Sequence, residues 1–134
     1  MDTAKDRCLL IVDDEPHIIN SLIRELHGEK YNILTATSAG VALQLIRENR
    51  IGVILSDFVM PGMDGITFLN HAGRIDSKTI HIILTAHGAF ESVVRTITES
   101  PIFKYIAKPW SQSEMKSTLA AAFVAYEANL ERKG

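Results

Sequence analysis

The sequence predicts a small doubly wound α/β domain built on a five-stranded parallel sheet. Two patterns alternate along its 134 residues, which are enough for one domain with a single core. Short runs rich in β-branched residues are followed by longer stretches in which apolar residues recur three and four positions apart. Alternating units this short favour strand–helix–strand crossovers, which place the strands in parallel.

The predicted strands are short apolar runs. The middle runs are apolar at successive positions, as a sheet covered by helices on both faces requires. The five runs lie at residues 8–12, 32–36, 53–56, 80–85 and 103–107.

Helical spacing fills the intervals between these runs. The first expected helix covers about 16–28 and stops at Gly28, and the second opens at Ser38, a residue type that favours the N-cap. The other expected helices cover about 65–73, about 89–99, and the stretch from the end of KPWS to about residue 131.

The composition indicates an ordinary soluble protein of the cytoplasm. Hydrophobic residues make up 46% and charged residues 22% of the chain, and a net charge of −2 gives no electrostatic grip on nucleic acid or anionic membrane. The longest apolar stretch is far shorter than the roughly 20 residues of a membrane span, and the first residues do not form a signal peptide. The single cysteine, Cys8, is predicted to be a small core residue.

Reactive side chains follow four of the five apolar runs. Asp13 and Asp14 come after the first run, Asp57 after the third, Thr85 at the end of the fourth, and Lys108 after the fifth. Because the carboxyl ends of parallel strands meet at one edge of a sheet, three carboxylates, a hydroxyl and an amine are expected to converge there.

This combination of groups suits phosphoryl chemistry. Clustered carboxylates are the oxygen-rich ligands that Mg²⁺ prefers, and the cation offsets their repulsion. One carboxylate can act as a nucleophile and form an acyl phosphate, while a lysine and a hydroxyl bind the phosphoryl oxygens. Taken singly, Asp14 can instead cap the first helix, and Asp64 can be a turn residue and helix cap. The remaining histidines lack metal-ligand spacing and are expected at the surface or at helix ends: His17, His27, His71 and His81.

Four motifs, IVDDEP, LSDFVMPGMDG, ILTAHG and YIAKPW, occur in this order. Together they resemble the receiver domain of bacterial two-component response regulators, which includes the chemotaxis regulators, over about Cys8 to residue 126. The resemblance implies a flavodoxin-like fold with strand order 2-1-3-4-5 and a phosphorylation-dependent signalling switch. It divides the chain into a receiver domain, 1–126, and a C-terminal helix extension, 127–134, which could link to an output domain.

The resemblance also assigns roles at the predicted edge. It implies that Asp57 is the phosphoacceptor, and that Asp13, Asp14, Asp57 and the backbone carbonyl of Val59 hold Mg²⁺, or Mn²⁺ in its place. It further implies a cis peptide bond between Lys108 and Pro109.

Five further roles follow from the same resemblance. Thr85 and Lys108 contact the phosphoryl group, and Tyr105 swings inward when the Thr85 hydroxyl moves. Val59 and His87 are the positions that tune the lifetime of the phosphoryl group. Val59 offers no polar side chain to position water, while His87 either reaches the phosphoryl group or faces solvent.

The resemblance implies two kinds of partner. A sensor histidine kinase or a phosphotransfer protein supplies the phosphoryl group, and an output domain or target reads the face formed by the fourth helix, fifth strand and fifth helix; a homodimer is a further expectation. Such a domain speeds its own phosphorylation and dephosphorylation but is not a turnover enzyme. The expected face comprises Phe90, Val94, Ile97, Tyr105 and the exposed side of 112–126.

Some features depart from the common pattern. Ser100-Pro101 replaces a small-residue link before the fifth strand. Trp110, followed by a long last helix, resembles receivers attached to signalling-nucleotide hydrolases or related enzymatic outputs. Core packing explains the first half of that helix. Its second half could extend outward or fray, and this overrun favours a receiver from a longer regulator over a stand-alone one.

Three other functions compete with this interpretation. An aspartate-nucleophile phosphohydrolase needs an acid two residues after its nucleophile on the first strand and a cap over its substrate, but the sequence has adjacent aspartates and no room for a cap. A nucleotide- or flavin-binding module needs a glycine-rich loop where this chain has acids. A pseudo-receiver that only binds partners would not need Asp57, Thr85 and Lys108 together.

Overall fold

The computed structural model describes residues 7–86 and 102–131 and confirms the predicted fold class. Five parallel strands form one sheet in the order β2-β1-β3-β4-β5, which is the expected order. The strands are β1 (Cys8–Val12), β2 (Asn32–Ala36), β3 (Val53–Asp57), β4 (Ile80–Thr85) and β5 (Lys104–Ala107).

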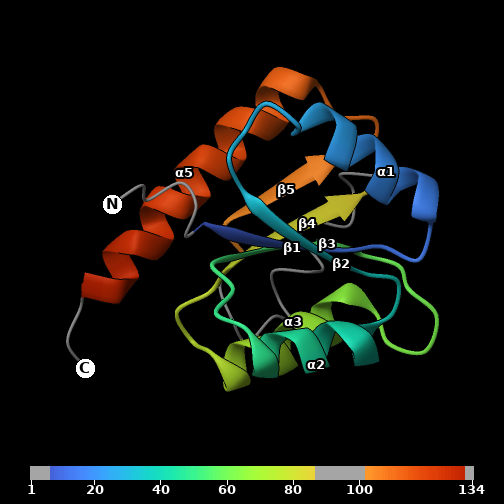
Figure 1. The fold of residues 1–134 in the computed structure, drawn as a ribbon. Coiled ribbons are helices and arrows are strands. Elements are labelled where there is room, and N and C mark those ends of the chain that lie inside the picture. Colours follow the sequence, from blue (N-terminus) through green and yellow to red (C-terminus); the bar gives the residue numbers. More distant parts are fainter. Residues whose placement is uncertain (1–6, 87–101, 132–134) are drawn as a thin grey trace.

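Helices cover both faces of this sheet (Figure 1). They are α1 (Pro16–Glu25), α2 (Ala39–Glu48), α3 (Gly65–Ile75) and α5 (Gln112–Glu131). Helices α1 and α5 lie on one face, and α2 and α3 lie on the other. The helix expected at 89–99 lies outside the described residues. Among the helices of residues 7–86 and 102–131, none is both long enough and apolar enough to cross a membrane.

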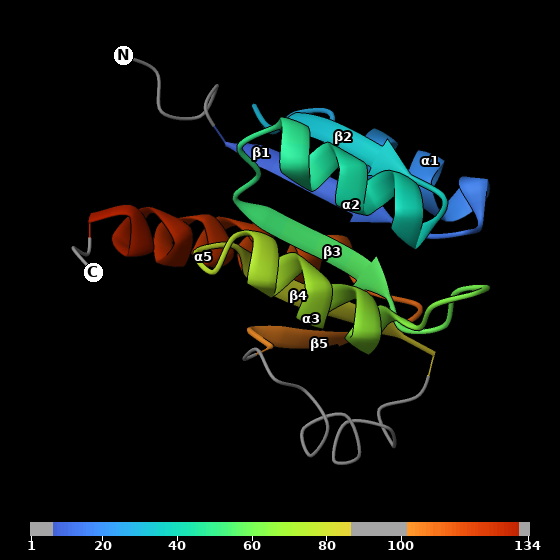
Figure 2. The same ribbon diagram turned by 90° about the horizontal axis from the view of Figure 1, so that it is seen from below.

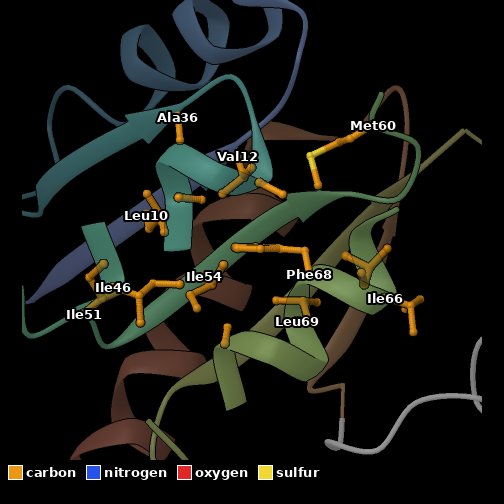
Figure 3. Packing of buried hydrophobic residues seen from close by; sticks show 14 of the residues in the cluster. Leu10, Val12, Ala36, Ile46, Ile51, Ile54, Met60, Ile66, Phe68 and Leu69 are labelled. Atoms are coloured by element: carbon orange, nitrogen blue, oxygen red, sulfur yellow. The ribbon is translucent and has the colours of Figure 1, made fainter. Parts of the chain in front are cut away.

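Strands β1 and β3 are buried along their whole length, because each lies inside the sheet and under helices on both faces. Alternate residues therefore enter two separate apolar clusters: Leu10 and Ile54 pack toward α2 and α3, and Leu9 and Leu55 pack toward α1 and α5. Figure 3 shows the first cluster, in which Phe68 of α3 lies close to Ile54. Cys8 is buried in the same cluster, as predicted, and burial raises the pKa of its thiol.

The first helix is shorter than predicted. Helix α1 ends at Glu25 rather than at Gly28, and Leu26 is its C-cap. The next turn is closed by the Glu29 backbone N–H, which donates to the Leu26 carbonyl oxygen at 2.9 Å. Because Gly62 alone has a positive φ among the described glycines, Gly28 does not serve as the left-handed residue that the prediction required.

Two of the predicted helix caps are confirmed. The Ser38 hydroxyl accepts a hydrogen bond from the Val41 backbone N–H at 3.3 Å, and an Asp64 carboxylate oxygen accepts one from Thr67 at 2.8 Å. The alternative role for Asp14 is wrong, because Glu15 occupies the N-cap position of α1 and makes no side-chain cap. Asp14 is therefore left for the site at the end of β1.

The last helix contacts the domain beyond its first half. Tyr126 is buried, and the Glu127 carboxylate binds the Arg7 guanidinium through two hydrogen bonds of 2.9 and 3.0 Å. The Asn129 side chain donates to the Lys78 carbonyl oxygen at 3.1 Å. The expected extension, 127–134, thus packs along the domain where the structure describes it, except that the Leu130 side chain is 42% exposed.

Gly65, the first residue of α3, is a position where close approach requires glycine. Its backbone N–H donates to the Phe58 carbonyl oxygen at 2.8 Å, and a Cβ atom there would overlap the carbonyl oxygen of Asp57. We expect Gly65→Ala to lower the free energy of unfolding by about 2 kcal/mol, because backbone atoms must move to make room. Urea unfolding followed by circular dichroism measures the change.

Gly40 provides the matched control for this substitution. It lies in the first turn of α2, and a Cβ atom added there would meet no packed neighbour within 4 Å among the described residues. Gly40→Ala should therefore stabilise the fold by about 0.5–1 kcal/mol, the usual gain from alanine in a helix. Equal effects of the two substitutions would contradict the close approach at Gly65.

Candidate functional site

The candidate site lies at the carboxyl ends of the strands, where the sheet register brings distant residues together. Asp13 follows β1, Asp57 ends β3, and Thr85 ends β4. The register pairs Asp57 with Leu84, so the ends of β3 and β4 are level. Lys108 follows β5, and its backbone N–H donates to the Thr85 carbonyl oxygen at 2.8 Å. Figure 2 shows β2 and β3 ending at the same edge of the sheet.

Three carboxylates meet at this edge. One oxygen each of Asp13, Asp14 and Asp57 lies within 4.8 Å of the others. Asp13 is fully buried, Asp57 is 7% exposed, and Asp14 is the most exposed of the three. A cluster of hard oxygen ligands, open on one side, fits a Mg²⁺ ion that keeps several waters.

The geometry of Asp13 follows from the turn after β1. One of its carboxylate oxygens accepts a hydrogen bond from the Glu15 backbone N–H at 2.9 Å, which holds the side chain over the end of the strand. Its other oxygen accepts from the Lys108 ammonium at 3.3 Å. The buried carboxylate therefore has a partner on each oxygen, as a charge in this position requires.

Lys108 joins the two buried carboxylates. Its ammonium donates to Asp13 and, at 3.2 Å, to Asp57. Burial alone would lower the pKa of Lys108, but the charges of Asp13 and Asp57 outweigh burial and raise that pKa above its usual value. The lysine thus keeps its positive charge at the place where the negative charges gather.

The surroundings of the Asp57 carboxyl disfavour its ionised form. Burial raises its pKa, the nearby charge of Asp13 raises it further, and Lys108 opposes both effects only in part. A carboxylate in this environment gains from any added cation and from reaction at its oxygen. The cluster can therefore bind a divalent cation and present Asp57 as a nucleophile.

The other predicted site residues differ in how deeply they are buried. Thr85 is buried at the end of β4, and Tyr105 on β5 is half-buried and packs against the cluster on the α2 and α3 side. Val59 lies in the loop after β3 with 70% of its surface exposed, and His87 lies outside the described residues. The peptide bond between Lys108 and Pro109 is cis, as predicted.

One histidine prediction is wrong. His81 is not a surface residue: it is 2% exposed on β4, and its Nε2 atom lies 2.8 Å from the Thr79 hydroxyl oxygen. The physical reason is that the register pairs His81 with Ile54 of the fully buried β3, so the side chain enters the interior. His17 and His27 are exposed as predicted, and His71 is partly exposed.

Sequence reasoning missed a contact beside Lys108. The Trp110 indole N–H donates to a Glu25 carboxylate oxygen at 2.8 Å, and the Gln112 side chain donates to the Glu25 carbonyl oxygen at 3.3 Å. These bonds join the segment after β5 to the end of α1. The only signal in the sequence was the unusual aromatic residue two positions after the lysine.

Comparison with known sequences identifies the family to which these features belong. The family model for the response regulator receiver domain matches residues 9–120. The hydrogenase transcriptional regulatory protein HoxA of Cupriavidus necator is 31% identical over 121 residues, which are 90% of this chain and 25% of that protein. The heme response regulator HssR of Staphylococcus aureus is 31% identical over 120 residues, or 90% of this chain and 53% of that protein. The chain therefore spans a quarter to about half of these relatives.

Solved structures are similar over nearly the whole chain. The signal receiver domain of an HD domain-containing protein from Pseudomonas fluorescens Pf-5 superposes with a TM-score of 0.88 at 28% identity, covering 95% of this chain and 93% of that one. The beryllofluoride-activated receiver domain dimer of NtrC4 superposes with a TM-score of 0.80 at 31% identity, covering 89% of this chain and 98% of that one.

Proposed function

The chain belongs to the response regulator receiver domain family, and we propose that it is a switch that accepts one phosphoryl group on Asp57. The observation that carries this proposal is the arrangement around Lys108, whose ammonium contacts Asp13 and Asp57 within 3.3 Å. It provides a nucleophile and a fixed positive charge at one place. Two-component signalling is the function of the family, and what we propose for this chain in particular is that Asp57 is the acceptor.

The acidic cluster would hold the metal ion. Asp13, Asp14 and Asp57 would bind Mg²⁺, or Mn²⁺ in its place, together with the backbone carbonyl of Val59. When bound, the ion supplies positive charge that offsets the negative charge of the phosphoryl oxygens. The closeness of the three carboxylate oxygens supports this assignment.

The reaction transfers the phosphoryl group from a nitrogen or oxygen atom of the donor to a carboxylate oxygen of Asp57. A carboxylate oxygen of Asp57 attacks the phosphorus atom, and the bond from phosphorus to the donor atom breaks as the acyl phosphate forms. A phosphohistidine of a sensor kinase or of a phosphotransfer protein would be the donor. The Lys108 ammonium, already 3.2 Å from Asp57, is placed to bind an oxygen of the incoming group.

The new group would then change the packing behind the site. The bound phosphoryl group carries about −1.5 to −2 charge in place of the single negative charge of the Asp57 carboxylate, and the Thr85 hydroxyl is drawn toward the added oxygens. Tyr105, which pairs with Ile83 across the β4–β5 register, could then pack further inward. Packed side chains have discrete arrangements, so a local change of charge would change the surface formed by β5 and α5. Val59 and His87 would tune how long the phosphoryl group persists.

That surface would meet an output domain, a target protein or a second copy of the chain. The relatives support different outputs, since HoxA is a transcriptional regulatory protein and the Pseudomonas fluorescens receiver comes from an HD domain-containing protein. The NtrC4 receiver forms a dimer, which supports a homodimer here. We propose that residues 1–126 are the receiver and that 127–134 lead toward the output, in the cytoplasm.

Acetyl phosphate tests the proposed function directly. Incubation with Mg²⁺ should add one phosphoryl group per chain, detected by intact-mass spectrometry, because the small donor needs no kinase. Removing the divalent metal with a chelator should abolish the addition, since the charge of the phosphoryl oxygens is then uncompensated. Restoring Mg²⁺ or Mn²⁺ should restore it. No addition in the presence of Mg²⁺ would favour a pseudo-receiver that only binds partners.

A further inference from the structure

The segment that carries Lys108 is fixed at two points. On the sheet side, the Lys108 backbone N–H donates to the Thr85 carbonyl oxygen. On the helix side, Trp110 donates to the Glu25 carboxylate at 2.8 Å, and Gln112 adds a bond to the Glu25 backbone. Trp110 is partly buried against the apolar cluster of α1 and α5. Trp110 lies two residues beyond the lysine, so only Pro109 separates the two along the chain.

The Lys108 side chain has open space beside it. A cavity of about 380 Å³ lies between α1 and the segment after β5. A lysine side chain with four rotatable bonds next to such a space can leave the one conformation that reaches Asp57. The cavity is lined by Ile18, Ser21, Glu25, Lys108, Pro109 and Trp110.

Glu25 lines the same cavity and is a competing anion. Its carboxylate would attract the Lys108 ammonium away from Asp13 and Asp57 if it turned toward the cavity. The indole N–H of Trp110 instead binds one of its oxygens, and a partly buried indole N–H itself needs such an acceptor. The bond therefore gives the Trp110 N–H its acceptor and occupies one oxygen of the Glu25 carboxylate.

We propose that Trp110 is a positioning residue for Lys108. Its hydrogen bond to Glu25 holds the segment after β5 against α1, so that the Lys108 ammonium stays on Asp13 and Asp57. In the active domain, this keeps the positive charge in place for phosphoryl transfer; that consequence rests on the proposed function. The positioning itself does not, and the two parts can be tested separately.

The first test needs no phosphoryl donor. The chain is labelled briefly with an amine-reactive succinimidyl ester, and labelling of Lys108 is measured by peptide mass spectrometry against the exposed Lys78. Trp110→Phe keeps an aromatic ring and removes the N–H donor, so Lys108 should react about threefold faster. Glu25→Ala breaks the same bond and also removes the competing carboxylate, so it tests the loss of the anchor alone, and Lys108 should again react faster than in the wild type. Ser21→Ala alters the same cavity without touching the bond and should label like the wild type.

The second test asks whether Trp110 acts through Lys108. With acetyl phosphate and Mg²⁺, Trp110→Phe should slow phosphorylation by about three- to tenfold. Added to Lys108→Ala, the same substitution should cause no further loss, because the group that it positions is already gone. A merely structural role would lower the rate equally in both backgrounds.

The outcomes separate the two claims. Lys108 labelling that is the same in wild type, Trp110→Phe and Glu25→Ala would overturn the positioning role, as would equal loss of rate in both backgrounds. If the wild type takes up no phosphoryl group but Trp110→Phe still exposes Lys108, the proposed function fails and the positioning role stands. Circular dichroism confirms that each variant is folded, and Glu25→Ala serves if Trp110→Phe is not.

Discussion

Asp57→Asn is expected to abolish phosphoryl uptake from acetyl phosphate. An amide has no charged oxygen to attack phosphorus, and it also removes one of the three carboxylates of the acidic cluster. The substitution preserves the size of the side chain, and Lys108 keeps its contact with Asp13 at 3.3 Å. Intact-mass spectrometry in Mg²⁺ should therefore show one added group in the wild type and none in the variant.

A stability measurement shows that this loss is chemical. Burial and the charge of Asp13 raise the pKa of Asp57, so ionised Asp57 destabilises the metal-free fold at neutral pH. Replacing it with a neutral amide should raise the midpoint of thermal unfolding in a chelating buffer. An inactive variant that is less stable than the wild type would point to a damaged fold instead.

Asp64→Asn is the matched control for the acceptor. Asp64 is an exposed aspartate whose carboxylate caps α3 through the Thr67 backbone N–H, and asparagine caps helices equally well. Its uptake of the phosphoryl group should equal that of the wild type. Undiminished uptake by Asp57→Asn would mean that another residue is the acceptor.

Much of the fold was predictable because hydrophobic periodicity reflects burial directly. Every predicted strand is present, and the strand predicted at 53–56 is observed one residue longer, as β3, Val53–Asp57. Turn chemistry was less reliable. Gly28 was expected to end α1, but the chain closes a tight turn at Leu26 without a left-handed residue, and glycine alone does not distinguish these two endings.

The site was predictable because a parallel sheet sends the residues after its strands to one edge. Asp13, Asp57 and Lys108 could be grouped from their positions alone, and the structure joins them through hydrogen bonds. The contact of Trp110 with Glu25 could not be predicted, because it links two segments that are 85 residues apart and belongs to no periodic pattern.

His81 shows the limit of reasoning from residue type. Histidine is most often partly exposed, and the prediction followed this preference although the run IHIILT is otherwise apolar and was expected to form a strand. Its hydrogen bonding assigns a tautomer: the Thr79 hydroxyl donates its proton to the Asp76 carbonyl oxygen, so it must accept from the His81 Nε2–H. The Nδ1 atom is then a buried acceptor that has no hydrogen-bond partner among residues 7–86 and 102–131.

The buried imidazole should make stability depend on pH. Burial lowers the pKa of His81 to about 4, and the charge of Asp76 opposes this only in part. In the unfolded chain the pKa is about 6.5, so between these values the unfolded state binds the proton more readily. Neutral His81 therefore contributes to the free energy of unfolding at pH values above the pKa of the unfolded chain. This contribution is lost as the pH falls toward the pKa of the folded protein. With about 1.4 kcal/mol per pH unit, the total loss is of the order of 3 kcal/mol.

Replacement of the imidazole isolates this effect from that of the carboxylates. His81→Leu removes the titrating group and the unpaired Nδ1 acceptor, while Thr79 keeps its bond to Asp76. The stability difference between wild type and variant, measured by urea unfolding from neutral pH down to about pH 4, should therefore shift in favour of the variant as the acid increases. The same substitution at the exposed His27 controls for the exchange of histidine for leucine outside the interior. The wild type and the His81→Leu variant could instead lose stability in parallel as the pH falls. That result would show that His81 is protonated equally in the folded and the unfolded chain, and that its buried Nδ1 atom finds a compensating partner on acidification.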